Sequence, residues 1–375
     1  MHELAPLHPA RRDHLGVLTD EVGIHQHAIG SSPDPTHGYC TDDVARALQV
    51  DLLHGRELGW DVVVDSAWRN VRFLVDAFDE SSGRFRNFRN AGGSWVDGEG
   101  SEDCHGRAMW ALGETVATAP DAAMAEAAAQ LMTKALPAAS NLSAARARSS
   151  ALLGCDAALR VAPSSAIART HRLLADRLVT SFRPRDAAAW PWPEPSLTYE
   201  NALPTHALIV AGTRLASRTM VDGALELLDW LIAVQTAPSG HLSPVGNGWW
   251  PRGGERSQFD QQPIEATSLL LACDAAFRAT DRGRYRSAME RSYAWFLRRN
   301  DLGVDVAVPA RGACHDGLMP AGVNANEGAE STLMWLIALE QIRALRGERS
   351  SRDRARIAHP AIHPKPDHLI AAASS

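Results

Sequence analysis

The sequence predicts an all-α protein, a single (α/α)6 toroid built from six helical hairpins. Three observations support this prediction: a composition dominated by Ala and Leu, an alternation of two kinds of helix along the chain, and long loops at one end of the helices. Ala and Leu favour helices, whereas Tyr and Phe, which favour strands, number only 4 and 8. A chain of 375 residues exceeds the usual domain size, so it needs two domains or one large closed architecture.

One kind of helix is amphipathic. In residues 63–78 and 221–232, apolar residues recur at spacings of three and four, with charged residues on the opposite side. Helices of this kind cover one face of a core, so we expect them in an outer layer. Similar segments fall at about 10–22, 122–137, 166–182 and 284–299.

The other kind of helix is apolar or small on nearly every side, as in residues 108–113 and 268–273. Such a helix is predicted to be buried all round. Six buried helices that alternate with amphipathic ones fit a closed double ring, because outer neighbours cover each inner helix. We place the inner helices at about 42–56, 104–118, 147–161, 202–216, 265–279 and 327–345.

The loops that lead from an outer helix to the next inner helix are mostly long and rich in Gly, Pro and Trp. Long ordered loops in compact domains usually carry function, so the functional end is expected where the inner helices begin. The toroid is expected to span 1–346, and residues 347–375 show no apolar periodicity and are expected to form a mobile tail. The long loops cover residues 79–102, 185–200, 237–264 and 301–326.

Composition and charge exclude several classes of function. The chain has 38 Lys and Arg against 44 Asp and Glu, a net charge of −6, and no basic stripe, so nucleic acid is not an expected partner. No apolar run could cross a bilayer and the N-terminus does not resemble a signal peptide, so we expect no membrane partner and a cytoplasmic location. The five cysteines lack CxxC spacing, so we expect reduced thiols, no metal site and no cofactor.

Acidic or hydrogen-bonding residues cluster at the start of five of the six predicted inner helices. Helix capping explains each cluster taken alone. A closed ring, however, points all of them at one small volume, where like charges repel and raise some pKa values. Glycoside hydrolysis needs one protonated and one ionised carboxyl group, and a wide cleft that admits water between substrate and base favours inversion. The catalytic candidates are Asp43, Asp103, Glu265 and Glu327.

Tryptophans in the long loops are candidates for sugar binding, because a large ring can stack on the apolar face of a pyranose. Trp249 and Trp250 form the best candidate platform, and pinning of the loops to the core is the alternative role for each of these rings. The other residues expected to bind substrate are His25, Tyr39, Asp42, Arg46, Glu102, His105, Tyr199, Glu200, Asn201, Gln262, His315, Asp316 and Asn326.

Three motifs resemble those of six-hairpin glycosidase-like proteins. They are GYCTDDVARAL at 38–48, DQQPIEA at 260–266, and DGL at 316–318 followed by NANEGAEST at 324–332. The resemblance covers about 15–345 and implies the toroid and a carbohydrate ligand. Similar modules occur fused to glycosyltransferases, so it also implies a functional association with such an enzyme. The His and Glu signature of N-acylglucosamine epimerase-like toroids is not evident in this sequence.

Three functions follow as hypotheses. The first is a glycoside hydrolase that acts on an oligosaccharide or glycoside through paired carboxylates, and the acidic clusters favour it. The second is a sugar epimerase or isomerase in which His105, His206 or His315 transfers protons. The third is a non-catalytic saccharide-binding partner of a glycosyltransferase, which would keep the tryptophans without needing paired acids.

Overall fold

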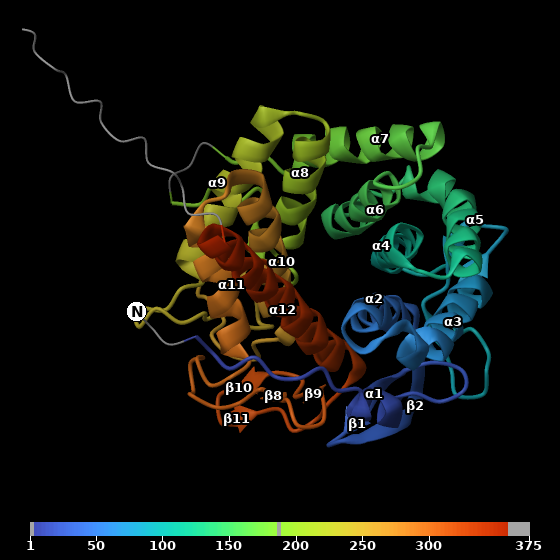
Figure 1. The fold of residues 1–375 in the computed structure, drawn as a ribbon, viewed down its shortest axis with the longest axis horizontal. Coiled ribbons are helices and arrows are strands. Elements are labelled where there is room, and N and C mark those ends of the chain that lie inside the picture. Colours follow the sequence, from blue (N-terminus) through green and yellow to red (C-terminus); the bar gives the residue numbers. More distant parts are fainter. Residues whose placement is uncertain (1–3, 186–188, 359–375) are drawn as a thin grey trace, which may run out of the picture.

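The protein forms a double ring of helices, as the sequence predicts. The computed structural model describes residues 4–185 and 189–358, with side chains described up to residue 347. Inner helices surround the axis, and outer helices lie around them (Figure 1). The inner helices are α2 (Thr41–Leu58), α4 (Glu102–Thr118), α6 (Ala145–Ala158), α8 (Leu203–Arg214), α10 (Pro263–Thr280) and α12 (Ala329–Ala358). The outer helices are α3 (Trp60–Ala77), α5 (Ala122–Ala139), α7 (Ser165–Ser181), α9 (Arg218–Val234) and α11 (Gly283–Trp295).

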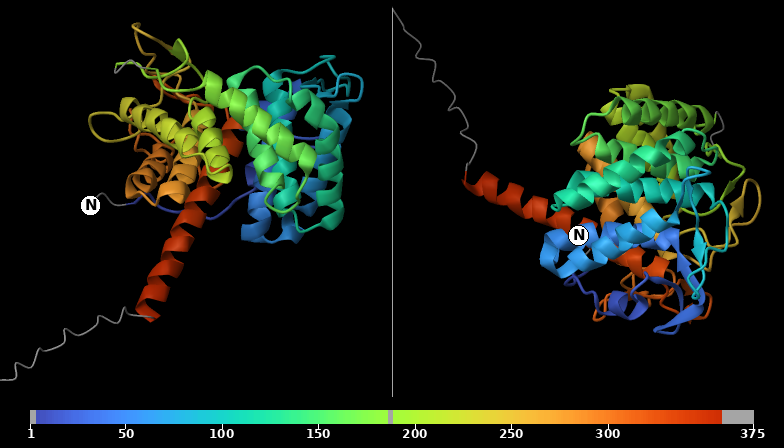
Figure 2. Two further views of the ribbon diagram at one scale, coloured as in Figure 1. Left: turned by 90° about the horizontal axis from the view of Figure 1, so that it is seen from above. Right: turned by 90° about the vertical axis from the view of Figure 1, so that its right-hand side faces the viewer.

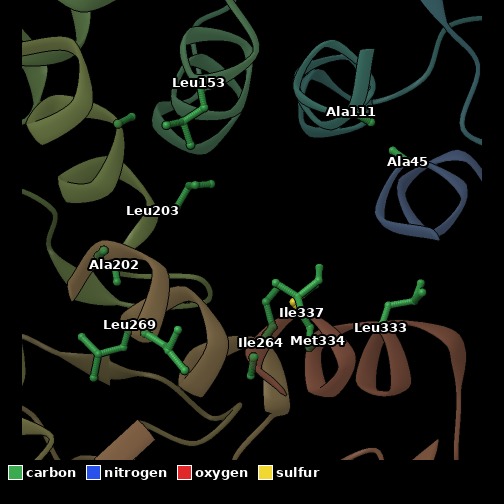
Figure 3. Close-up of a cluster of buried hydrophobic side chains, with 14 of the residues drawn as sticks. Ala45, Ala111, Leu153, Ala202, Leu203, Ile264, Leu269, Leu333, Met334 and Ile337 are labelled. Carbon is green, nitrogen blue, oxygen red and sulfur yellow. The ribbon is translucent and has the colours of Figure 1, made fainter. Parts of the chain in front are cut away.

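The inner helices are buried all round because each contacts two inner neighbours and an outer helix. Apolar side chains from all six project into the interior of the ring (Figure 3), among them Ala45, Ala111, Leu153, Leu203, Ile264 and Leu333. The outer helices bury one stripe and expose the other side, as α3 does with Val63, Ala67, Val71 and Leu74.

Two glycines allow a close approach between α4 and α6. A Cβ atom at Gly113 would lie 2.0 Å from the carbonyl oxygen of Gly154, and one at Gly154 would lie 2.2 Å from that of Met109. The two helices therefore pack backbone against backbone, and no larger residue fits at either position without moving a helix.

The sixth outer position differs from the prediction. The expected helix at 10–22 is wrong, because α1 (Asp13–Leu18) has only six residues. The helix stops where the carboxylate of Asp20 accepts hydrogen bonds from the backbone N–H groups of Val22 and Gly23, at 2.8 and 3.1 Å. Such a side-chain bond offers the backbone a turn in place of a helix.

The N-terminal segment takes the place of that outer helix by running along the last hairpin. The hydroxyl of Tyr293 on α11 donates to the carbonyl of Pro6 at 2.9 Å, and Arg343 on α12 donates to the carbonyl of His8 at 2.7 Å. His14 lies 2.8 Å from the carbonyl oxygen of Glu327. The start of the chain is thereby held against its last inner helix.

The segments that lead into the inner helices contain short antiparallel strands that the helical periodicity did not predict. They gather at the end of the ring where the inner helices begin, and their backbone pairing gives the cavity described below a fixed rim. One sheet has the order β1 (His25–Ile29), β2 (Ser32–Cys40), β5 (Phe88–Arg89). The pairs are β3 (Phe78–Asp79) with β4 (Arg84–Phe85), β6 (Ser196–Leu197) with β7 (Trp250–Pro251), β8 (Ala307–Val308) with β9 (Ala313–Cys314), and β10 (Leu318–Met319) with β11 (Gly322–Val323).

The last inner helix is longer than predicted. Helix α12 continues to Ala358 rather than ending near residue 345, and it projects from the side of the ring opposite to the long loops (Figure 2). Residues 346–358 include five arginines and two alanines, which favour a helix although the segment has no apolar stripe. The remainder of the expected tail, 359–375, lies outside the described residues, and its mobility stays a prediction. Within the described chain, no helix has the length and apolar character needed to cross a membrane.

Candidate active site

A cavity of about 670 Å³ opens at the end of the ring where the inner helices begin. This volume lies within the range of about 300–1,000 Å³ that is typical of small-molecule sites. Its wall combines side chains from α2, α4, α10 and α12 with side chains from the long loops. Two arginines, Arg46 and Arg107, and one histidine, His27, belong to the wall. So do six carboxylates: Asp42, Asp43, Asp103, Asp260, Asp316 and Glu330.

Several residues predicted from the sequence meet at this cavity although they are far apart along the chain. Of the four catalytic candidates, Asp43 and Asp103 line it. The predicted substrate-binding residues that line it are Asp42, Arg46, Tyr199, Trp249, Gln262 and Asp316.

Asp43 is the most perturbed carboxyl group of the wall. It lies in the first turn of α2, and its side chain is almost completely buried, with a residue exposure of 3%. Burial raises the pKa of Asp43 to about 7, and the negative charges of Glu330 and Asp42 add to the rise, whereas Arg46, 3.0 Å away, opposes it. A carboxyl group of this kind holds its proton up to neutral pH.

Asp103 lies in the first turn of α4 and has a different environment. The hydroxyl of Tyr199 donates a hydrogen bond to its Oδ2 atom. Burial and the nearby Asp103 charge raise the pKa of Tyr199, so its hydroxyl stays a donor. The Oδ1 atom of Asp103 is buried and has no hydrogen-bond partner among the described residues. That oxygen therefore has unused capacity to accept a hydrogen bond.

Two buried arginines form the floor of the cavity. Arg46 contacts Asp43 at 3.0 Å and Glu330 at 2.9 Å, and Arg107 contacts Asp42 at 3.3 Å and Glu200 at 2.6 Å. We call these two arginines with their four carboxylates the arginine layer. Burial opposes the charge of Arg107, but Glu200 and Asp42 outweigh it and raise its pKa. The layer connects α2, α4 and α12 with the loop that precedes α8.

Trp249 and Trp250 have different environments. Trp249 lines the cavity, is 48% exposed, and has a left-handed backbone with φ 65°. This conformation is uncommon for a bulky residue and costs on the order of 1–3 kcal/mol, so it persists where the surroundings impose it. Here the backbone N–H and carbonyl of Trp249 are held by Gly246 and Ser257, both at 2.9 Å.

Trp250 packs instead into a cluster with the other loop tryptophans. Its ring is stacked on Trp230 of α9 and lies edge-on to Trp190, with centroids 6.5 and 5.3 Å away. Its indole N–H donates to the carbonyl of Gly254 at 3.2 Å. Trp250 therefore joins the long loops to the outer layer, which is the alternative role that the sequence left open for these rings.

Glu265 and Glu327, the other two catalytic candidates, do not belong to the cavity wall. The carboxylate of Glu265 accepts hydrogen bonds from the backbone N–H of Glu200 and from the side chain of Asn201, the latter at 3.1 Å. Glu327 forms an ion pair with Arg311 at 2.7 Å and lies 3.7 Å from His14. These contacts hold loops and helices together, although burial raises the pKa of Glu265 to about 7.

Other predicted binding residues also lie outside the wall and make structural contacts. Glu102 accepts hydrogen bonds from the backbone N–H groups of Ser143 and Ala144, at 2.8 and 2.6 Å, and so fixes the start of α6. Tyr39 donates to Asp20, and the ring of His25 stacks on it at a centroid distance of 4.9 Å.

The remaining predicted binding residues also lie outside the cavity wall and make contacts with other parts of the chain. The ring of His105 lies 3.2 Å from the carbonyl of Ala135, and Asn326 accepts a hydrogen bond from the backbone of Gly30 at 3.0 Å. His315 lies 3.9 Å from Glu327. Glu200 and Asn201 belong to the contacts of Arg107 and Glu265 described above.

Arg107 and Glu330 are wall residues that the sequence interpretation missed. Arg107 follows the acidic start of α4, in a helix that is otherwise small and apolar. A charged residue on a helix buried all round needs a partner, and that signal marks Arg107 as part of a polar site. The other missed wall residues include His27, Phe88, Asn247, Asp260, Met319 and Asn324.

The cysteines and the side chains that could bind a metal ion were further candidates for a site within the described chain. All five cysteines lie within the described chain, and each is free and buried. Burial raises the pKa of the Cys40 thiol, and the charges of Asp42 and Asp43 raise it further. Among the described residues, no three His, Cys, Asp or Glu side chains are grouped so that they could hold a metal ion.

Comparison with known proteins shows the fold. The sequence matches no family model and no curated protein. Cellobiose 2-epimerase from Spirochaeta thermophila superposes with a TM-score of 0.67 at 12% identity, over 88% of this chain and 92% of the epimerase. A glycoside hydrolase family 76 α-mannanase from Bacteroides thetaiotaomicron gives 0.60 at 10% identity, over 91% and 96%. An unsaturated glucuronyl hydrolase specific for heparin gives 0.51 at 10% identity, over 82% and 98%. At these identities the likeness is one of fold, and the chain has the (α/α)6 toroid architecture.

Proposed function

We propose that this protein is a carbohydrate-active enzyme, a glycoside hydrolase that cleaves an oligosaccharide or glycoside. The observation that carries the proposal is the pair Asp43 and Asp103, which line one cavity in different environments. Asp43 is buried with a pKa of about 7, and Asp103 has a buried Oδ1 atom without a hydrogen-bond partner among the described residues. Two carboxyl groups whose surroundings differ in this way can divide the roles of acid and base.

In the proposed reaction, protonated Asp43 donates its proton to the glycosidic oxygen as the bond to the anomeric carbon breaks. Asp103 accepts a proton from the water that attacks the anomeric carbon, while the Tyr199 hydroxyl donates a hydrogen bond to its Oδ2 atom. The attack comes from the face opposite to the leaving oxygen, so the product has inverted configuration. The exposed ring of Trp249 supplies a surface on which a sugar can stack.

A sugar epimerase is the second candidate, and two observations bear on it. The structures with similar folds include a cellobiose 2-epimerase and a D-mannose isomerase. The three histidines expected to transfer protons, however, are not part of the cavity wall. Burial lowers the pKa of His206 to about 4, and the ring of His206 lies against Trp110. His27 is the one histidine of the described wall, and it would need a carboxylate as its partner.

The proposal is tested by incubating the protein with manno-, gluco- and galacto-oligosaccharides and measuring new reducing ends together with the anomer first formed. Asp43→Asn and Asp103→Asn are each expected to lower turnover by about 10²–10⁴-fold, because an amide cannot transfer the proton. Glu327→Gln is the matched control, a buried carboxylate changed outside the wall.

Three results would overturn the proposal. Conversion of a sugar into an isomer of the same chain length would establish the epimerase instead. Binding of oligosaccharides without conversion across the panel would establish the non-catalytic binding protein. Unchanged turnover in both aspartate variants would remove the roles given to this pair. A cytoplasmic location and an association with a glycosyltransferase stay predictions.

A further inference from the structure

Another cavity, of about 730 Å³, lies beside the outer helix α11 and the loop that follows α9. None of the described residues that line it belongs to the wall of the candidate active site. Ser239 and His241 of the loop form part of its wall, and the ring of His241 contacts the carboxylate of Asp301 at 2.6 Å. This cavity therefore has a hydroxyl, an imidazole and a carboxylate next to one another.

Hydrogen bonds join these three side chains in one chain. The hydroxyl of Ser239 lies 2.8 Å from Nδ1 of His241, and Nε2 of the same ring lies 2.6 Å from Oδ1 of Asp301. An ionised carboxylate can only accept a hydrogen bond, so the Nε2 atom carries the proton of the neutral ring. The Nδ1 atom then has a lone pair that accepts the hydrogen bond from Ser239. A histidine in this arrangement can remove the proton of a serine hydroxyl.

Asp301 is fixed in position and ionised. Its side chain is 8% exposed. Its Oδ2 atom accepts hydrogen bonds from the hydroxyl of Ser243 at 2.7 Å and from the side-chain amide of Gln261 at 2.6 Å. Burial alone would raise the pKa of Asp301, but the hydrogen bonds from His241, Ser243 and Gln261 together lower it. The carboxylate therefore orients the imidazole without taking its proton.

Ser239 is exposed in a tight turn. The backbone N–H of Ala237 donates to the carbonyl of His241 at 2.9 Å, and that of Gly240 donates to the carbonyl of Ala237 at 2.8 Å. Gly240 has a φ of 87°, a conformation that glycine adopts readily. The turn thereby holds the serine beside the histidine and leaves it accessible from the cavity.

The cavity wall is basic. The carboxylate of Glu290 forms an ion pair with Arg346 at 2.6 Å, so it does not offset the charge of the wall. A positive wall favours an anionic ligand, and it also favours the negative charge that develops on a carbonyl oxygen when a hydroxyl attacks it. The described wall contains Glu290 as its one carboxylate and four arginines, Arg286, Arg291, Arg298 and Arg299.

We propose that Ser239, His241 and Asp301 form a serine esterase centre, separate from the candidate active site, whose substrate is an ester with a negatively charged group. The Oγ atom of Ser239 attacks the ester carbonyl carbon, and its proton passes to Nδ1 of His241. The bond from the carbonyl carbon to the alcohol oxygen then breaks, and the departing alkoxide takes that proton. Water attacks the acyl-serine with the same histidine as base, which releases the acid and restores the hydroxyl.

The first experiment treats the full chain with a fluorophosphonate, which modifies activated serine hydroxyls, and locates the label by mass spectrometry of peptides. We expect the label on Ser239 and a rate of labelling about 100-fold lower or less in His241→Ala. Ser287→Ala is the matched control, because Ser287 lines the same cavity and its hydroxyl donates to the carbonyl of Gly283 at 3.2 Å. An unlabelled Ser239, or equal labelling in wild type and His241→Ala, would overturn the proposal.

The second experiment tests the substrate class by comparing the hydrolysis of 4-acetoxybenzoate with that of phenyl acetate, its neutral counterpart. We expect a kcat/KM about tenfold or more higher for the anionic ester, a difference that shrinks as salt is added. Ser239→Ala should lose the enzymatic rate on both esters. Equal kcat/KM values would overturn the anionic substrate, and a rate retained by Ser239→Ala would overturn the site.

The third experiment tests Asp301 as the residue that positions His241. The ¹⁵N NMR signals of His241 should show the proton of the neutral ring on Nε2 in wild type. In Asp301→Asn the amide can also donate to the ring, so the other tautomer should appear and labelling of Ser239 should slow while the protein stays folded. A wild-type ring with its proton on Nδ1 would overturn the proposed hydrogen-bond chain.

Discussion

Arg46 on the first inner helix and Glu330 on the last inner helix form an ion pair at 2.9 Å. The side chain of Arg46 is 6% exposed and that of Glu330 is 39% exposed, so the pair runs from the buried floor to the accessible wall. Asp43 shares the same arginine. The charge of Glu330 therefore reaches the proposed proton donor both directly and through Arg46, and the pH dependence of activity should report it.

The first prediction is that kcat/KM falls above about pH 7. Asp43 must carry its proton to act as an acid, and burial raises its pKa to about 7. Below that pH the group is protonated and active, and above it each further pH unit lowers the active fraction about tenfold. A pH series of kcat/KM on a cleaved substrate measures this limb. A profile that stays flat to pH 9 would contradict the assignment of Asp43.

The second prediction is that Glu330→Gln moves this alkaline limb to lower pH. Removing the negative charge removes a repulsion that raises the pKa of Asp43, and it leaves Arg46 with Asp43 as its remaining acidic contact. Both effects favour the ionised form of Asp43, so its pKa falls. The same pH series on wild type and variant measures the shift. A limb that stays in place or moves upward would show that Glu330 does not act on this group.

The third prediction distinguishes the two neighbouring tryptophans. Trp249→Ala should weaken oligosaccharide binding by about 1 kcal/mol or more, roughly fivefold in Kd, with little change in Tm, because the ring faces the cavity. Trp250→Ala should lower Tm by several degrees, because its ring packs on Trp190 and Trp230. Calorimetric titration and thermal melts of both variants are the measurements. The assignment fails if the two variants show the same pattern.

The fourth prediction concerns the contact between α4 and α6. Gly154→Ala should destabilise the protein by about 1–3 kcal/mol, because the added Cβ would lie 2.2 Å from the carbonyl oxygen of Met109. Gly283→Ala is the control, since a Cβ there meets no atom within 4 Å. Chemical denaturation of both variants gives the free energies of unfolding. Equal stability of Gly154→Ala and wild type would mean that the two helices separate at no cost.

The alternation of buried and amphipathic helices could be predicted because it depends on periodicity alone. The inner helix predicted at 104–118 is observed as Glu102–Thr118, and the outer helix predicted at 122–137 is observed as Ala122–Ala139. The end of α1 depends on a turn that the side chain of Asp20 imposes, and the extension of α12 depends on the helix propensity of its residues. Neither effect has an apolar period, so the periodicity argument missed both.

The candidate site could be predicted only in part, because the sequence indicates where a helix begins but not where each side chain points. Asp43, Asp103 and Glu265 all lie in the first turn of an inner helix. The sequence pattern around them therefore gives the same prediction for all three. A helix turns about 100° per residue, so a helix boundary that is uncertain by one or two residues leaves the direction of a side chain undetermined. Position along the chain could therefore place these acids at one end of the ring. It could not distinguish those that line the cavity from Glu265, which caps the backbone at Glu200 and Asn201.

The contacts between α12 and the N-terminal segment have a consequence for folding during synthesis, because the ring closes only when α12 is present. Arg343 of α12 donates to the carbonyl of His8, and Arg46 pairs with Glu330 of α12, so contacts of the N-terminal segment and of the first inner helix need the last inner helix. A nascent chain that has not yet released this helix from the ribosome has an open ring with apolar inner faces uncovered. Fragments that lack α12 should therefore be prone to aggregate.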